Sequence, residues 1–226
     1  MINDITSPTP AGWYTIRSKK SGYYQCYHDA KACGDKDNQN NSLSSTLNVG
    51  EMRIILRWPK TNPVTAKDLD AHLSIPDNDS TGTLHLYYGT RNGKDYIIYA
   101  SADDNVTIDK DHKATYTPPS PPGDETITIT KVRSGTYRFS VHNYTDMDND
   151  TGVSDCCPNY KTNLLRSNAK VKVFYNKEGT LIRKRFYVPS AEGTLWTVFT
   201  FDSSGSGSGF TVVDNMSYLE DAANIY

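Results

Sequence analysis

The sequence predicts an all-β protein, folded as an antiparallel β-sandwich of the Ig-like or jelly-roll type. Three observations lead to this class. Short runs of β-branched and aromatic residues recur along the chain, apolar and polar residues alternate within many of them, and clusters of Gly, Pro, Asn and Ser separate one run from the next. The 226 residues are enough to enclose one large hydrophobic core.

The first part of the chain, residues 1–48, is expected to form an N-terminal β-strand arm and a polar loop. Aromatic, β-prone runs at residues 12–18 and 22–27 predict two strands, separated by a Lys-Lys-Ser-Gly turn. The loop follows at residues 28–46, where polar residues predominate. Residues 49–226 are then expected to form the β-sandwich domain.

The sandwich domain contains further β-prone runs at hairpin-like spacing. Ten strands are expected, at residues 51–58, 69–75, 83–90, 95–100, 125–130, 135–144, 169–176, 179–189, 195–202 and 209–215. The pair Asn92-Gly93 predicts a tight hairpin between the strands on either side of it. The terminal segment 217–226 is the one place where we expect a helix.

Alternation within the run T-Y-R-F-S-V-H predicts which side chains meet the core. Tyr137, Phe139 and Val141 are two residues apart, so they share one face of the strand, which we expect to point inward. The same rule puts His142 on the opposite face. We therefore expect His142 to be a surface histidine.

Composition excludes some partners. The formal net charge of −2 gives no electrostatic reason to expect binding to nucleic acid or to an anionic membrane. No apolar run approaches the roughly 18–20 residues of a membrane span, so we expect none. The first residues lack the basic and then apolar pattern of a signal peptide. The 16 tyrosines suit sheet faces and contact surfaces.

Cysteine usage favours an extracellular or cell-surface protein with disulfide bonds. The spacing of Cys26, Cys33, Cys156 and Cys157 lacks the close pairs of a zinc site, although free thiols and a metal site stay open as alternatives. Four cysteines allow three connectivities. We favour bonds from the N-terminal cysteines to the Cys156-Cys157 loop, because a ring between adjacent cysteines is strained. This pairing predicts a long disulfide-linked loop. Six N-x-S/T sequons fit secretion.

Six motifs follow one another in a characteristic order: EMRIILRW with DLDAHLSIPD, LYYG, GDETITIT, GTYRFSVHNY, AKVKVFYNKEGTLIRKRFYVP, and GTLWTVFTF with VDN. In this order, over roughly residues 49–215, the chain resembles a bacterial cell-surface β-sandwich module, the YfaP/DUF2135-type domains. The run GWYTIRSKKSGYY resembles the closing strands of a carboxypeptidase-regulatory-like (transthyretin-type) domain, which often precedes that module. The resemblance implies an all-β fold and a surface location.

Two aspartates suggest a metal site on the strand that begins DLDAH. A single residue separates Asp68 from Asp70, so an extended chain points both carboxylates to the same face. Like charges this close need a cation, hydrogen-bond donors or solvent. The family resemblance implies that the turn at Asp103 and Asp104 lies nearby and adds oxygen ligands. A structural hydrogen-bonding role for one aspartate is the alternative.

A second candidate for calcium is the segment DMDNDTG. It has Asp146, Asp148 and Asp150 at alternate positions, from which oxygens wrap around a hard cation. The segment departs from the EF-hand pattern, because glycine comes one position late and Cys157 stands where the bidentate Glu belongs. The alternative for this segment is a solvated turn. Calcium is the one cofactor that the sequence suggests.

The sequence contains no recognisable catalytic motif. It lacks a G-x-S-x-G elbow, an H-E-x-x-H helix, a P-loop and a G-x-G-x-x-G turn. His72 and His85 lie on expected strands and are able to approach each other, but two strand histidines are more often exposed or hydrogen-bonded than metal-bound. We therefore expect a protein that is not an enzyme.

Two non-catalytic functions remain. The first is a structural or assembly subunit of a surface appendage or matrix, in which the N-terminal strands add to the sheet edge of another copy or another extracellular protein. The alternative for these strands is pairing within their own chain, because exposed edges are normally covered. The alternative is a calcium-dependent adhesive module that binds a glycan or a protein. Four tyrosines near the Asn-Gly pair are candidates for stacking on such a ligand, or else pack on one another: Tyr87, Tyr88, Tyr96 and Tyr99.

Overall fold

The computed structural model describes residues 12–32, 44–59, 68–77, 82–90, 96–101, 104–112, 123–144, 160–204, 209–219 and 221–225. The chain divides into two compact units, Met1–Thr46 and Leu47–Tyr226, which are considered separately.

The smaller unit contains a β-hairpin. Strand β1 (Gly12–Ser18) pairs antiparallel with β2 (Cys26–Ala32) in continuous register, and an isolated bridge joins Tyr23 to Ser45. The second strand begins later and runs further than its sequence predicts, into the segment expected to be a polar loop. Backbone pairing to β1 satisfies the same hydrogen-bonding groups whether the side chains are apolar or polar, so polar residues continue the strand.

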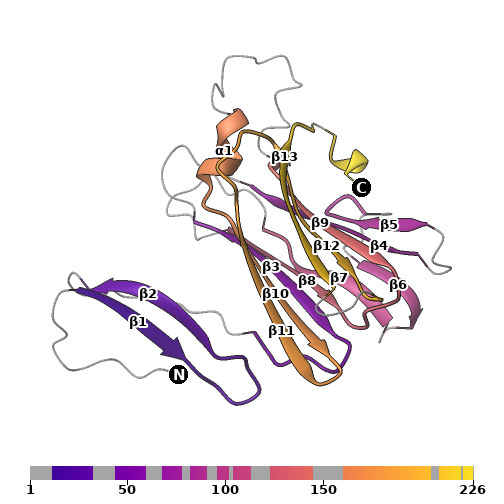
Figure 1. The fold of residues 1–226 in the computed structure, drawn as a ribbon, viewed down its shortest axis with the longest axis horizontal. Coiled ribbons are helices and arrows are strands. Elements are labelled where there is room, and N and C mark those ends of the chain that lie inside the picture. Colours follow the sequence, from indigo (N-terminus) through magenta and orange to yellow (C-terminus); the bar gives the residue numbers. More distant parts are fainter. Residues whose placement is uncertain are drawn as a thin grey trace. The chain divides into compact units, whose positions relative to one another are not determined.

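The larger unit is a sandwich of two antiparallel sheets (Figure 1), so the all-β prediction is confirmed. In spatial order, the six-stranded sheet consists of β11 (Thr180–Tyr187), β10 (Lys170–Lys177), β3 (Met52–Trp58), β8 (Gly123–Ile129), β7 (Asp104–Lys110) and β6 (Tyr96–Ser101). The five-stranded sheet consists of β13 (Phe210–Ser217), β12 (Leu195–Asp202), β9 (Thr136–His142), β4 (Asp70–Pro76) and β5 (Thr83–Leu86).

The core lies between the two sheets and is built by strand alternation. Tyr137, Phe139 and Val141 are at most 1% exposed, which confirms the predicted inner face of β9. Trp58 is also fully buried, and it packs so closely on Gly123 that a Cβ at that position would lie 2.0 Å from the indole ring. Glycine at the start of β8 is therefore required by packing against the neighbouring strand.

In the C-terminal segment, where a helix was predicted, the described residues form one short 3-10 helix, η3 (Ala222–Asn224). An α-helix that the sequence analysis missed, α1 (Tyr160–Arg166), lies between β9 and β10. Ser167 and Asn168 terminate it. The Ser167 hydroxyl donates to the carbonyl of Leu164, and Asn168 has a left-handed φ of 52°. Such a short helix leaves too few turns for a periodic apolar pattern to be recognised.

One strand was missed and one hairpin prediction is wrong. Strand β7, which begins at Asp104 after the predicted turn, was not expected, and its Val106 and Ile108 alternate toward the core. Strands β5 and β6 belong to different sheets, so the pair Asn92-Gly93 does not close a hairpin between them. Residues 92 and 93 themselves lie outside the described residues. A short polar connection is compatible with a crossing between sheets as well as with a hairpin.

Within the described part of the chain, no helix has both the length and the apolar character needed to cross a bilayer.

Candidate metal centre

The candidate site begins where β4 starts, at Asp70. In the antiparallel pairing of β4 with β9, Asp70 lies directly opposite His142, and His72 lies opposite Ser140. Because side chains two residues apart share a face, Asp70, His72 and His142 project from one side of the sheet, away from Ala71 and Leu73 in the core. Strand pairing thus brings together residues that are far apart in the sequence.

These three residues form the first ligand group. One carboxylate oxygen of Asp70 and one ring nitrogen of each histidine lie within 4.8 Å of one another. Their side chains are buried, with residue exposures of 5% for Asp70, 1% for His72 and 0% for His142. The prediction that His142 is a surface histidine is therefore wrong. The segment after β13 covers this face of the sheet, and its Leu219 carbonyl lies 2.9 Å from Nε2 of His142.

A second group shares Asp70 with the first. Oxygens of Asp68, Asp70 and Glu125 also lie within 4.8 Å of one another, and all three residues are buried. Glu125 comes from β8 in the opposite sheet, and its Oε2 accepts a hydrogen bond of 2.6 Å from the backbone N–H of Ala71. The second group therefore joins the two sheets of the sandwich, and Asp70 links it to the first group.

Several polar atoms of the two groups have no hydrogen-bond partner among the described residues, although they are buried. They are Nε2 of His72, Nδ1 of His142, Oδ2 of Asp70 and Oε1 of Glu125. More than nine in ten buried polar groups in folded proteins are hydrogen-bonded. Four such atoms in two ligand groups that share one residue are thus an unusual concentration, and each atom has a lone pair in at least one protonation state.

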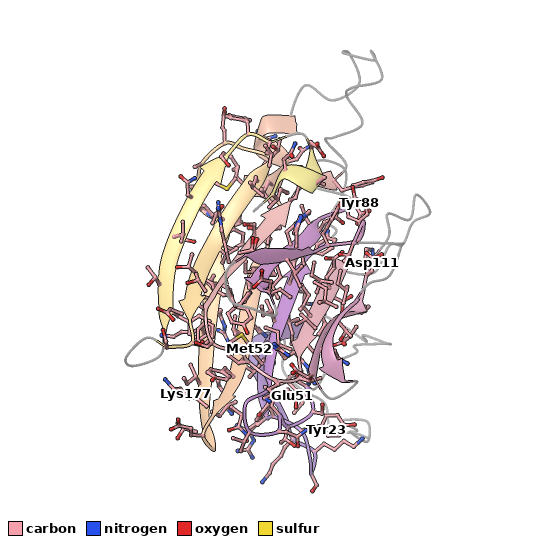
Figure 2. All side chains as sticks on the ribbon, turned by 90° about the vertical axis from the view of Figure 1, so that its right-hand side faces the viewer. Tyr23, Glu51, Met52, Tyr88, Asp111 and Lys177 are labelled. Atoms are coloured by element: carbon pink, nitrogen blue, oxygen red, sulfur yellow. The ribbon has the colours of Figure 1, made fainter. Side chains whose placement is uncertain are left out.

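An aromatic wall supports His72. Its Nδ1 lies 2.9 Å from Nε2 of His85, which confirms that these two strand histidines approach each other. Tyr87 stacks on both rings, at centroid distances of 4.3 Å to His85 and 5.3 Å to His72. Tyr88 meets Tyr87 and Tyr144 edge-on. Tyr88 and Asp111 lie in the half of the sandwich away from Met52 and Lys177 (Figure 2).

The sequence Tyr-Tyr-Gly-Thr after β5 holds that wall in place. Thr90 closes the turn, because its backbone N–H donates to the Tyr87 carbonyl at 2.9 Å and its Oγ1 accepts from the Tyr87 N–H at 2.7 Å. Gly89 leaves room for the folded-back ring, since a Cβ there would lie 2.6 Å from Cε2 of Tyr87. The local sequence thus positions Tyr87 over the histidines.

Burial and mutual repulsion disfavour the charged forms of the carboxyl groups. Burial raises the pKa of Asp70 to about 8, with additional contributions from the charges of Asp68 and Asp111. Burial also raises the pKa of Glu125 well above its ordinary value, followed by the charge of Asp70, while the hydrogen bond from Ala71 acts in the opposite direction. Without a cation these two carboxyl groups therefore favour their protonated forms, and a cation bound beside them would favour the carboxylates.

The histidines are held neutral. Burial lowers the pKa of His72 well below its ordinary value, and the neighbouring His85 and His142 add to this effect. Burial lowers the pKa of His85 to about 4 and also lowers that of His142, against the opposing hydrogen bond to Leu219. Neutral imidazole is the form that binds metal ions, because it has a free nitrogen lone pair.

The arrangement has the properties of a closed divalent-metal site. It combines two imidazole nitrogens with up to three carboxylates, the donor types that zinc and other first-row divalent ions accept. A cation between the carboxylates would remove their mutual repulsion and would accept the lone pairs of the unpartnered atoms. Since every ligand residue is at most 6% exposed, the geometry matches structural metal sites better than catalytic ones, which keep one position open.

The structure brings some of the sequence-predicted ligands together and separates others. Asp68 and Asp70 belong to the site. Asp104 starts β7, where the guanidinium of Arg133 contacts both its oxygens at 2.6 and 3.1 Å. Asp111, whose charge acts on Asp70, follows the other end of β7. The rise of a strand places Asp104 about 20 Å from Asp111, so Asp104 lies far from the site. The other predicted ligands lie outside the described residues: Asp103, Asp146, Asp148 and Asp150.

The remaining candidates are placed as follows. Tyr87 and Tyr88 are half-buried in the aromatic wall. Tyr96 and Tyr99 lie on β6, and their side chains are outside the described part of the structure. The backbone of Cys26 belongs to β2, without a described side chain. The other cysteines lie outside the described residues: Cys33, Cys156 and Cys157.

Three ligand candidates were not predicted from the sequence: His72, His142 and Glu125. A local signal exists for His72. In the run D-L-D-A-H, ligand-type residues occupy every second position and therefore share one face of the strand. No comparable signal exists for His142 or Glu125. They are placed by the pairing of β4 with β9 and by the packing of the two sheets.

No family model matches this chain, and a search of the curated proteins also finds no match. The resemblance to YfaP/DUF2135-type domains therefore stays a prediction that rests on the motifs alone.

Proposed function

We propose that this protein is a non-catalytic β-sandwich module whose sandwich is held together by a buried divalent metal ion, and that it serves as a structural or assembly subunit at the cell surface. The observation that carries the metal-binding part is that two buried ligand groups share Asp70, and that Asp70, His72, His142 and Glu125 each have a buried side-chain atom without a partner among the described residues. An ion bound there would connect β4 and β9 of one sheet with β8 of the other.

The closed geometry supports a structural ion over a catalytic one. A catalytic metal needs an open coordination position that a substrate or water can reach. The ligand residues are instead covered by the C-terminal segment around Leu219 and by the aromatic wall of Tyr87. We therefore keep the interpretation that the protein is not an enzyme.

Thermal unfolding tests the metal-binding function. Protein stripped with EDTA is melted alone and with an excess of Mg²⁺, Ca²⁺, Mn²⁺ or Zn²⁺, and the bound metal is measured by mass spectrometry. An ion at a hundredfold excess over its Kd should stabilise the native state by about 2.7 kcal/mol, a shift of several degrees. Asp70→Asn should abolish the response, because Asp70 belongs to both groups.

The control is Asp124→Asn. Asp124 is a strand carboxylate that pairs with Lys110 at the surface and belongs to neither ligand group. This variant should respond to the ion like the wild type. If none of the four ions shifts the melt of the wild type, the metal-binding function is wrong.

The assembly role is supported by strand edges. Among the described strands, β13 pairs only with β12, and its Val212 and Val213 are 59% and 39% exposed. In the smaller unit, the described residues contain two strands and one isolated bridge, and a two-stranded hairpin alone is marginally stable in water. Both features fit the addition of a strand from another copy or another extracellular protein.

Sedimentation of the full chain tests this role. We expect self-association that is weakened by Val212→Lys, because a charge on an edge strand blocks pairing. It should be lost when residues 1–27 are deleted. Val49→Lys is the matched control, since Val49 is 67% exposed and lies outside the strands. A full-length chain that stays monomeric at high concentration would rule out self-assembly.

The extracellular location, the Ig-like or jelly-roll type of the sandwich and the disulfide-linked loop belong to the same proposal. They are supported by the cysteine spacing, the sequons and the family resemblance. Peptide mapping without reduction provides the test. We expect Cys26 and Cys33 to be linked to Cys156 and Cys157, and four free thiols in the purified protein would contradict this.

A calcium-dependent adhesive module is the second candidate. The group of Asp68, Asp70 and Glu125 favours it, because carboxylate oxygens are the ligands that calcium requires. This function predicts glycan or protein binding that chelation abolishes. Binding on a glycan panel that is unchanged by EDTA would remove it.

A further inference from the structure

We propose that the ion at this site is a zinc-class ion, bound by Asp70, His72 and His142 with a fourth ligand from the carboxylates beside them, and that calcium does not replace it. This inference rests on the proposed metal-binding function and specifies its ligand. It is carried by the two imidazoles and by the residues that orient them.

Imidazole nitrogen separates the two classes of ion. Zinc and other first-row divalent ions accept nitrogen and oxygen together, usually in tetrahedral sets of four. Calcium takes six to eight oxygen ligands. The two groups here contain three carboxylates, and Oε2 of Glu125 is already occupied by the N–H of Ala71. Two buried imidazoles beside them would fill space that calcium needs for further oxygens.

The second ring nitrogen of His142 is engaged in the way that metal-bound histidines require. Its Nε2 lies 2.9 Å from the backbone carbonyl of Leu219, which can only accept a hydrogen bond. The proton of the neutral ring is therefore on Nε2, and Nδ1 carries a lone pair. Nδ1 is the nitrogen that lacks a partner among the described residues. A ligating histidine typically donates its other N–H to such a carbonyl.

His72 has an equivalent arrangement through His85. If Nδ1 of His72 donates to Nε2 of His85, the lone pair of His72 is on Nε2, the atom without a partner in the described structure. The opposite direction would leave a buried N–H at Nε2 without an acceptor, which is unfavourable. The stacked ring of Tyr87 holds both imidazoles in this orientation. His85 is therefore a positioning residue for the metal ligand.

The test compares zinc with calcium on EDTA-stripped, tag-free protein whose thiols have been blocked. We expect Zn²⁺ to bind with a stoichiometry of one by titration calorimetry and to raise the melting temperature, while millimolar Ca²⁺ does neither. His142→Gln should weaken zinc binding at least 100-fold. His85→Gln should weaken it by about 10- to 100-fold, as is typical when a partner of a ligating histidine is lost.

The matched control is His112→Gln, a described histidine that lies edge-on to Trp58 and belongs to neither ligand group. This variant should bind zinc like the wild type. Zinc binding that His142→Gln leaves unchanged would overturn the proposal, because the ion would then be bound elsewhere. Stabilisation by Ca²⁺ without a response to Zn²⁺ would overturn the zinc assignment while leaving the proposed metal-binding function intact. No response to any ion would remove both.

A second measurement keeps the test independent of whether the variants fold. Long-range ¹H–¹⁵N spectra of the wild type report the protonated nitrogen of each imidazole. On addition of zinc, we expect the resonances of Nε2 of His72 and Nδ1 of His142 to shift, with the proton on the other nitrogen of each ring. Unchanged spectra at saturating zinc would contradict the proposal.

Discussion

Asp104 and Asp70 are both buried carboxylates on strands of one sandwich, and they meet opposite surroundings. Asp104 is 8% exposed and contacts the guanidinium of Arg133 through both oxygens. Asp70 is 5% exposed, and its described neighbours include two further carboxyl groups and two neutral histidines. A buried carboxylate requires a compensating charge. The chain supplies a cation for Asp104. Asp70 has none among its described neighbours and has a raised pKa, so we infer that a metal ion from solution replaces the proton there.

The largest effect is expected where the chain's own cation is removed. Arg133→Met leaves Asp104 buried without its partner, and we expect a loss of about 3 kcal/mol in the free energy of unfolding. The loss should be the same with EDTA and with zinc, because Asp104 is remote from the metal site. Urea unfolding measures it. The exposed neighbour Lys131 serves as control, and Lys131→Met should change stability by less than about 0.5 kcal/mol.

Asp70→Asn should have the next largest effect, with a sign that depends on the metal ion. In EDTA, the wild type must either keep Asp70 protonated above its ordinary pKa or bury its charge, and the amide avoids both costs, so we expect the substitution to stabilise the protein by about 1–2 kcal/mol. In zinc, it removes the ligand common to both groups and should instead destabilise. Urea unfolding in the two buffers tests this inversion. Effects of the same sign in both buffers would mean that Asp70 and Asp104 do not differ as we infer.

A smaller effect is expected at the turn that holds the aromatic wall. Thr90→Val removes the acceptor of the Tyr87 N–H and should destabilise the protein by about 1 kcal/mol. It should also weaken zinc binding, since Tyr87 would no longer hold His72 and His85 in place. Thr83→Val, at an exposed position of β5, is the control for the substitution itself. Equal zinc affinity in both variants would show that the wall does not orient the ligands.

The sequence was sufficient to predict the all-β class and most strands, because period-two alternation is a local property. It predicted the inner face formed by Tyr137, Phe139 and Val141 for the same reason. It did not predict that the opposite face, with His142, is buried as well. That burial depends on the segment at Leu219, 77 residues further along the chain, and alternation within a strand contains no information about what covers its second face.

The site was predictable only in part. Asp68 and Asp70 were recognised because they lie close together in the sequence, and the same local pattern extends to His72. Glu125 and His142 join them through the pairing of strands and the packing of sheets, which single-sequence patterns do not determine. The proximity of Asp104 was inferred from the family resemblance, and a strand of seven residues separates Asp104 from the site.

The smallest effect is expected for a carboxylate that solvent already compensates. Asp124 pairs with Lys110, whose side chain is 54% exposed, at the surface of the six-stranded sheet. Water stabilises both charges when they are apart, so the pair contributes little, and Lys110→Met should change stability by less than about 0.5 kcal/mol. Urea unfolding at low and high salt checks this, because an exposed pair is screened. A loss near that of Arg133→Met would mean that burial is not what makes these carboxylates differ, and burial would then give no reason to expect an ion at Asp70.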